Sequence, residues 1–175
     1  LLVRTEAWRT VGGLDEDFFA HMEEIDLCWR LQNRGLMVGV TPEAHVYHLG
    51  GGTLQQESPN KAFLNFRNNL YLLLKNDHRP GIRGRILFRQ LLDGLAGLRF
   101  LMEGKPAFFK AVIRAHGEFR KNRTRMAGKR RLEKQSCSSP RPVGQLPGHY
   151  AGSVVWDFFV RGRKRFSALD QNRIS

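Results

Sequence analysis

The 175-residue sequence has only two cysteines, Cys28 and Cys137, and they lie far apart in segments of different character. Two distant cysteines give neither the dense pairing of a disulfide-stapled domain nor the spacing of a structural zinc site. Cys28 falls on the apolar side of a predicted helix, where cysteine behaves as a small buried hydrophobic residue. The cysteine content therefore indicates a chain that folds without disulfides in a reducing compartment.

Long hydrophobic runs are also missing. No uninterrupted apolar run reaches the roughly 18–20 residues that an α-helix needs to cross a bilayer. The sequence starts Leu1-Leu2-Val3-Arg4, without a methionine and without the pattern of a secretory signal peptide. This start leads us to expect a piece of a longer protein, and the absence of an apolar run argues against a transmembrane helix.

Acidic residues are scarce in the second part of the chain. Residues 79–175 hold 22 Lys or Arg and 6 Asp or Glu, a net charge of +16, whereas residues 1–78 hold 7 and 10, a net charge of −3. Such a division indicates two parts with different partners. We expect a catalytic α/β unit over 1–78, basic amphipathic helices at a membrane interface over 79–135, and a loop with a basic, aromatic tail over 136–175.

Hydrophobic periodicity and helix-ending glycines predict helices over 5–11, 23–34 and 61–75. Short apolar runs at 36–40 and 46–47 predict strands. The buried side of the second helix is predicted to consist of Ile25, Cys28, Trp29 and Leu31.

Beyond residue 79 the pattern is purely helical, with a break at Gly104 and Pro106. One apolar stripe comprises Phe88, Leu91, Leu92, Leu95, Leu98 and Met102, with Arg85, Arg89 and Asp93 on the opposite side. A second stripe comprises Phe108, Phe109, Val112, Ile113 and Phe119. Two interpretations stay open, because such helices suit the surface of an anionic membrane but their stripes can equally pack on the catalytic unit.

Three carboxylates crowd the start of the second helix, where Glu23, Glu24 and Asp26 fall within four residues. The helix dipole favours acids at this position, and most such acids are inert. Asp26 and Arg30 are four residues apart and can pair along the helix surface. A histidine, His48, follows the next extended segment, so the pattern suits a base and a metal ligand.

Several spaced elements resemble the C-terminal half of family 2 glycosyltransferases. They occur in the family's order over residues 1–78, and the basic remainder is similar to the tail of bacterial, rhamnosyltransferase-like members. The matching elements are Gly12-Gly13-Leu14-Asp15-Glu16, Phe18-Phe19, the acidic helix start with Asp26-Leu27-Cys28-Trp29-Arg30, Gly35, Pro42, His48 and Arg67-Asn68.

The resemblance implies an α/β fold, the C-terminal part of the Rossmann-like GT-A domain, and inverting transfer of a sugar from a nucleotide-sugar donor to an acceptor hydroxyl. By position Glu24 is the general base, where the family most often has Asp. His48 matches a histidine that completes a metal site, and Asp26 and Arg30 would hold the helix start in place. The remaining acids matched to substrate binding are Asp15, Glu16 and Glu23.

The resemblance further implies a divalent metal, Mg²⁺ or Mn²⁺, held by an Asp-x-Asp motif. Residues 15–17 match those letters but belong to a different motif, so we expect the metal ligands and the donor-binding half outside these residues. The isolated chain is then predicted to be inactive. By analogy, the acceptor is a saccharide or a lipid-linked saccharide of cell-surface synthesis, and the protein is cytoplasmic and peripheral on the inner membrane face.

The alternative hypothesis is a basic protein without catalysis that docks to membranes. Nucleic acid is the weaker partner, because large apolar stripes interrupt the basic residues and no recognised nucleic-acid motif is present.

Overall fold

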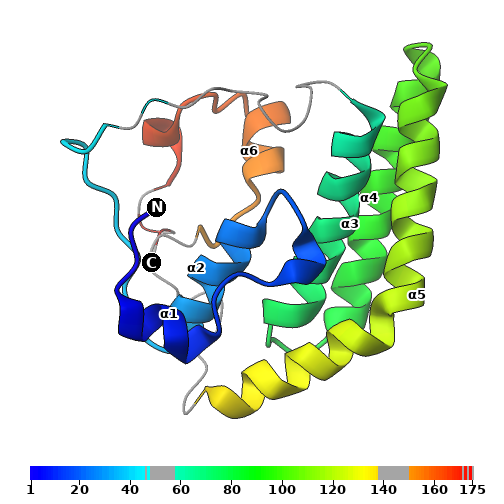
Figure 1. The fold of residues 1–175 in the computed structure, drawn as a ribbon. Coiled ribbons are helices and arrows are strands. Elements are labelled where there is room, and N and C mark those ends of the chain that lie inside the picture. The colour runs from blue at the N-terminus through cyan, green and yellow to red at the C-terminus, as the bar shows by residue number, and fades with distance from the viewer. Residues whose placement is uncertain (46, 48–57, 138–149, 171, 173, 175) are drawn as a thin grey trace.

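The computed structural model describes residues 1–45, 47, 58–137, 150–170, 172 and 174. Helices dominate these residues (Figure 1). In chain order the elements are α1 (Thr5–Val11), η1 (Glu16–Phe18), α2 (Glu23–Asn33), α3 (Pro59–Asn76), α4 (Ile82–Met102), α5 (Pro106–Ser136), α6 (Val154–Phe159) and η3 (Phe166–Ala168).

The predicted α/β class is wrong for the part of the chain that the structure describes. This part has no strand, and its β-type pairing is confined to an isolated bridge between Tyr150 and Ile174. The run 36–40, predicted as a strand, is irregular, and Met37 and Val40 are almost fully exposed. A strand needs neighbouring strands to satisfy its backbone groups, and none is described beside this run. Val46 lies outside the described residues, and Tyr47 has no regular structure.

Three long helices form the body of the molecule. Helices α3, α4 and α5 lie side by side as an up-and-down bundle, and α5 continues past the lower end of the others (Figure 1). The main core joins α3, α4 and α5 to η1 through Phe18, Leu70, Tyr71, Leu72, Leu74, Ile86, Phe119 and Met126. Helix α4 approaches α5 closely at Gly97, because a Cβ there would lie 3.1 Å from the ring of Phe109.

A smaller unit of α1 and α2 packs beside this bundle around Val11, Leu27 and Leu31. The predicted bounds of α1, and those of α2 to within one residue, are confirmed. Gly12 and Gly13 adopt φ values of 76° and 72°, which L-residues with side chains rarely accept, so glycine allows the sharp turn after α1. The predicted buried side of α2 is correct for Leu31 but wrong for Ile25, which is 47% exposed.

The two predicted apolar stripes behave differently. The stripe on α5 is partly covered, with Val112 and Phe119 buried and Ile113 exposed. The stripe on α4 faces outward along its whole length, and Asp93 on the opposite side of the helix is 1% exposed. No helix among the described residues combines the length and the apolar character needed to cross a membrane.

Candidate functional site

The segment between η1 and α2 has an unusual backbone. Phe19, His21 and Met22 have φ values of 62°, 66° and 70°, a region that residues with side chains seldom adopt. Each such residue costs roughly 1–3 kcal/mol and persists only where its surroundings hold it. This strained segment, residues 19–22, ends directly at Glu23, the first residue of α2.

Two neighbouring side chains on α3 hold this segment. The Asn68 amide nitrogen donates to the backbone carbonyls of Phe18, Ala20 and His21 at 2.9, 2.9 and 2.7 Å. Arg67 donates through Nη2 to the carbonyls of Asp17 and Phe18, both at 3.1 Å, and through Nε to Asn68 Oδ1 at 2.9 Å. Asn68 is fully buried. The pair therefore fixes the backbone that leads into the acidic helix start.

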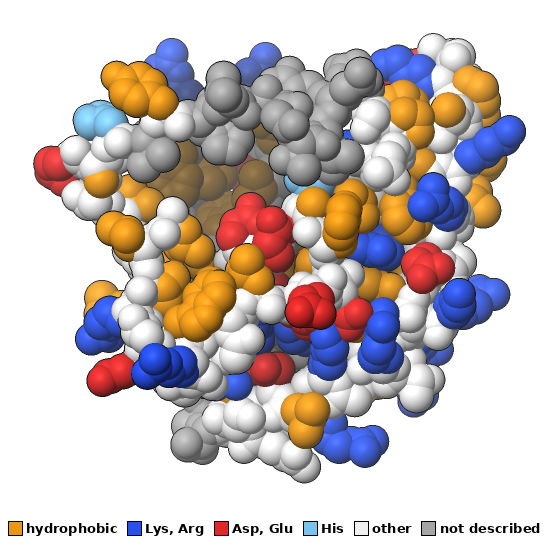
Figure 2. Space-filling view, viewed as in Figure 1, with side chains coloured by type: hydrophobic (Ala, Val, Ile, Leu, Met, Phe, Trp, Pro, Cys, Tyr) orange, Lys and Arg blue, Asp and Glu red, His pale blue; other side chains and the backbone are white. Residues whose placement is uncertain are grey.

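Glu23 and Glu24 occupy the first turn of α2 and differ in their surroundings. Glu24 is exposed, whereas Glu23 is half-buried. Glu23 Oε2 and His21 Nε2 are buried atoms without a hydrogen-bond partner among the described residues. Acidic side chains gather over α2 and the loop before it in the space-filling view (Figure 2). The site thus offers one solvent-facing carboxylate and two unpaired polar atoms beside it.

Asp26, one turn further along α2, is completely buried and fully paired. Its Oδ2 accepts hydrogen bonds from Arg30 Nε at 2.7 Å and Lys75 Nζ at 2.9 Å, and its Oδ1 accepts one from the Asn76 amide at 2.8 Å. Two of these donors come from the end of α3. Asp26 therefore fixes α2 against α3 and is not accessible to a substrate.

Arg30 connects this buried cluster to the glycine turn. Its Nη1 donates to the carbonyl of Val11 at 2.5 Å and its Nη2 to that of Gly13 at 2.7 Å. The planar guanidinium thus donates at the same time to a carbonyl at the end of α1 and to a carbonyl of the glycine turn. Asp26 and Arg30 have the positions expected of residues that hold the helix start, although their function remains a prediction.

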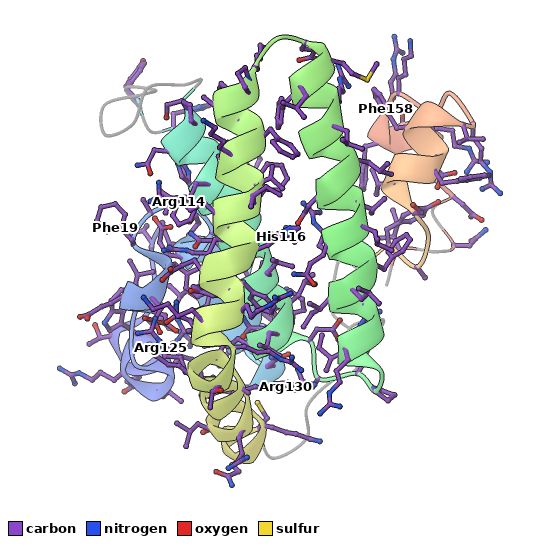
Figure 3. The ribbon with its side chains drawn as sticks, turned by 90° about the vertical axis from the view of Figure 1, so that its right-hand side faces the viewer. Phe19, Arg114, His116, Arg125, Arg130 and Phe158 are labelled. Atoms are coloured by element: carbon purple, nitrogen blue, oxygen red, sulfur yellow. The ribbon has the colours of Figure 1, made fainter. Side chains whose placement is uncertain are left out.

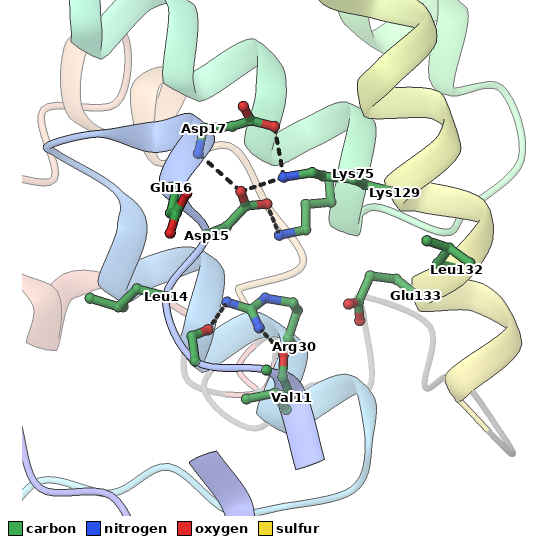
Figure 4. A pocket seen from close by; sticks show the side chains of 12 residues that line it. Val11, Leu14, Asp15, Glu16, Asp17, Arg30, Lys75, Lys129, Leu132 and Glu133 are labelled. Carbon is green, nitrogen blue, oxygen red and sulfur yellow. Dashed lines mark hydrogen bonds and ion pairs between the residues drawn. The ribbon is translucent and has the colours of Figure 1, made fainter. Parts of the chain in front are cut away.

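Asp15 lies in a second ionic cluster that lines a pocket of about 430 Å³ (Figure 4). Its carboxylate meets Lys75 Nζ at 2.6 Å and Lys129 Nζ at 2.5 Å, and it accepts from the Asp17 backbone N–H at 3.1 Å. Burial by itself raises the pKa of this carboxyl, but hydrogen bonds from Lys129 and Lys75 outweigh burial and lower the pKa from 3.8 to about 2. Asp15 is therefore occupied by protein cations.

The other two acids of this loop are Asp17, which is paired with protein cations, and Glu16, which is exposed. Asp17 pairs with Lys129 at 2.6 Å and with Arg125 at 2.9 Å, which ties η1 to α5. Glu16 lines the same pocket and is exposed. Among the acids predicted to bind substrate, Glu16 is exposed and Glu23 has one carboxylate oxygen without a partner among the described residues. Both carboxylate oxygens of Asp15 are paired with lysines.

The metal site stays a prediction, because none of its expected ligands is among the described residues. His48 lies outside them. Within them, no group of three or more His, Cys, Asp or Glu side chains is close enough to share a metal ion. The carboxylates of Asp15 and Asp17 instead face lysine and arginine. Asp15 and Asp17, which were not predicted as ligands, therefore do not fit a metal ion.

Sequence comparison finds that the chain is similar to named glycosyltransferases. Residues over a 107-residue stretch are 31% identical to the N-acetylglucosaminyl-diphospho-decaprenol L-rhamnosyltransferase of Mycobacterium tuberculosis, in both strain CDC 1551 / Oshkosh and strain ATCC 25618 / H37Rv. The match covers 57% of this chain but spans only about a third, 34%, of the relatives' length. No family model matches the chain, and no solved structure matches it. The similarity relates this chain to a glycosyltransferase.

Proposed function

We propose that the chain supplies the acceptor-side part of a family 2 glycosyltransferase that moves a sugar from a nucleotide-sugar donor to an acceptor hydroxyl with inversion. The relatives act on a saccharide linked through a diphosphate to decaprenol, according to their name. An acceptor of that class, a lipid-linked saccharide, is therefore our first choice. The observation that carries the proposal is the exposed Glu24 beside the braced, strained segment 19–22.

Glu24 is the proposed general base. An inverting transfer needs one carboxylate that removes the proton from the acceptor hydroxyl as its oxygen attacks the anomeric carbon. In this single displacement, the new carbon–oxygen bond forms as the bond to the nucleoside diphosphate breaks, and the carboxylate receives the hydroxyl proton. Glu24 faces solvent at the first turn of α2, where a substrate can reach it.

Glu23 and His21 are the proposed acceptor contacts. A buried polar atom without a hydrogen-bond partner destabilises the folded protein, so its presence calls for an explanation. Both atoms are covered in this conformation, so we propose that the two half-buried side chains turn when the acceptor binds and that acceptor hydroxyl groups then pair with Glu23 Oε2 and His21 Nε2. Glu16, exposed on the pocket rim, is proposed to contact substrate as well.

The buried clusters support this site by holding its backbone. Catalysis gains from groups already positioned for the transition state, and small displacements of such groups reduce the rate strongly. Helix α2 is fixed to α3 by the buried cluster of Asp26, Arg30 and Lys75. The segment before α2 is fixed by Asn68. We assign these residues to positioning and not to contact with substrate.

The test is a transfer assay on the whole protein that includes this chain. Nucleotide sugars are supplied with a diphosphate-linked N-acetylglucosaminyl lipid as acceptor, and nuclear magnetic resonance reads the anomeric configuration of the product. We expect a product with the configuration opposite to that of the donor. Retention of configuration, or no transfer to any saccharide acceptor from a folded whole protein, would contradict the proposal. The 175-residue chain alone is expected to give no turnover.

A further inference from the structure

Helix α4 presents its apolar side to solvent. Eight large apolar side chains, which we call the α4 face, are between 41% and 88% exposed: Leu87, Phe88, Leu91, Leu92, Leu95, Leu98, Leu101 and Met102. A helix on the surface of a water-soluble bundle normally turns such a stripe toward the core. An exposed apolar patch of this extent marks a surface that meets another apolar phase or partner.

The buried carboxylate of Asp93 fixes this orientation. Asp93, on the inner side of α4, pairs with Arg89 at 2.8 Å and with His116 of α5 at 3.3 Å. Rotating α4 to bury its leucines would expose the buried Asp93 carboxylate and move it away from His116 of α5, whereas Arg89, on the same helix, would move with it. The outward direction of the α4 face is thus held by specific contacts of the fold.

An arginine-lined pocket adjoins the α4 face. This pocket has a volume of about 420 Å³, and its lining includes Leu87, which also belongs to the α4 face. Its four arginines are Arg83 from α4 and Arg120, Arg123 and Arg130 from α5.

These four arginines are not all committed to the fold. Arg130 donates to the backbone carbonyls of Leu74 and Asp77. The other three, Arg83, Arg120 and Arg123, are exposed, and none has a carboxylate within 4.0 Å among the described residues. Unpaired guanidinium groups around a pocket suit a phosphate, which they bind through several N–H donors.

Together these features describe one surface with two chemistries. We propose that the α4 face and the arginine pocket dock this chain onto an anionic phospholipid membrane. The leucines and Phe88 enter the acyl boundary while α4 lies in the membrane plane, and a lipid phosphate enters the pocket. A second copy of the chain is a poor occupant, because residues 79–175 carry a net charge of +16 and would repel their own copy.

The membrane surface is separate from the acid site. Helices α1 and α2 lie on the opposite side of the bundle from α4, whereas α6, with the labelled Phe158, lies on the α4 side (Figure 3). Helix α6 adds Trp156, which is 56% exposed, and tryptophan favours the membrane interface. Variants of the α4 face therefore probe docking without altering the acid site, and failure of this proposal would leave the proposed sugar transfer untouched.

The experiment is co-sedimentation of the 175-residue chain with vesicles. One set contains phosphatidylcholine alone and the other contains phosphatidylcholine with phosphatidylglycerol. Two double variants remove the proposed contacts: Arg120→Gln with Arg123→Gln in the pocket, and Leu91→Gln with Leu95→Gln on the α4 face. A matched control, Arg4→Gln with Arg9→Gln, removes the same charge from exposed positions at the start of the chain and on α1. Circular dichroism verifies that each variant folds.

We expect the wild-type chain and the matched control to bind the anionic vesicles and to leave the neutral ones largely in solution. The pocket variant should lose roughly 30-fold in partitioning, as two basic residues near a charged surface would predict. The leucine variant should lose at least as much.

Three outcomes would overturn the proposal. If the pocket variant and the matched control lose vesicle binding equally, net charge alone determines the binding. Full binding by the leucine variant would remove the α4 face from the contact. Absence of vesicle binding, with a concentration-dependent dimer in sedimentation velocity that the leucine variant abolishes, would assign the face to a second copy.

Discussion

The side-chain amide of Asn68 donates a 2.7 Å hydrogen bond to the backbone carbonyl of His21, a residue 47 positions earlier in the chain. His21 has a φ of 66° and stands two residues before the acids of α2. The same amide also reaches the carbonyls of Phe18 and Ala20. One buried side chain on α3 therefore stabilises the backbone conformation from which the candidate base emerges.

Replacing Asn68 with alanine should destabilise the fold by about 2–3 kcal/mol, because the change leaves several buried carbonyls without a donor. Denaturant unfolding measures the loss, and hydrogen exchange should show faster exchange over residues 18–22. The neighbouring change Asn69→Ala, at a half-buried position, is the control and should cost less than 1 kcal/mol. Equal costs for the two variants would contradict the assigned function of Asn68.

Asp26→Ala should cost about 3–5 kcal/mol, since it leaves Arg30 and Lys75 buried without their shared carboxylate. Thermal unfolding in the same buffer gives the difference. Glu24→Gln is the matched control, because Glu24 is exposed on the same helix and its loss should change stability by less than about 0.5 kcal/mol. A mild effect of Asp26→Ala would mean that the cluster is not needed for the fold.

The low pKa of Asp15 predicts a defined acid dependence. The pKa of this carboxyl is lower in the folded chain, about 2, than its ordinary value of 3.8. Its contribution to stability is therefore complete above the ordinary value and is lost as the pH falls toward 2. The free energy of unfolding, measured from pH 5 to pH 2, should fall by on the order of 1–2 kcal/mol more in wild type than in Asp15→Asn. If the two proteins show parallel curves of unfolding free energy against pH, Asp15 does not contribute to the acid dependence of stability.

Lys129 of α5 should control the titration of Asp15. Its ammonium lies 2.5 Å from Asp15 and 2.6 Å from Asp17. Lys129→Gln removes the charge, so the pKa of Asp15 should rise toward its ordinary value, as followed by carboxyl carbon chemical shifts during titration. Lys134→Gln changes an exposed lysine of the same helix and should leave the titration unchanged. If the pKa of Asp15 does not move in Lys129→Gln, the low pKa comes from Lys75 and the backbone N–H of Asp17.

Local pattern predicted the helices well. Glycines at the ends of α1 and α2 and the apolar periodicity of α3 to α5 are signals within one element, and the structure confirms them. The pairing of Asp26 with Arg30 was also predictable from their four-residue spacing. Its burial was not, because Lys75 and Asn76 complete the cluster from positions 49 and 50 residues away.

Two features show where local pattern fails. The run 36–40 has the composition of a strand, but a strand depends on partners that composition does not reveal. The resemblance drew attention to Arg67 and Asn68 as a matching pair, yet nothing in their spacing showed that they hold a strained segment 47 to 50 residues earlier. The three positive φ values in that segment carry no sequence signal, since none belongs to a glycine.

The direction of α4 is a related case. Its stripe was predictable, whereas its exposure depends on the buried Asp93 and its contact with His116 of another helix. Periodicity identifies the two sides of a helix, and tertiary contacts decide which side faces the core.

The central claim, that Glu24 is the base of a sugar transfer, is tested most directly by the turnover of Glu24→Gln in the whole protein. Glu16→Gln, an exposed acid of the preceding loop, serves as the comparison. We expect Glu24→Gln to lower kcat by about 10²–10⁴-fold with donor affinity unchanged, and Glu16→Gln to affect mainly KM for the acceptor. Turnover near that of wild type in a folded Glu24→Gln protein would contradict the account and remove Glu24 as the base.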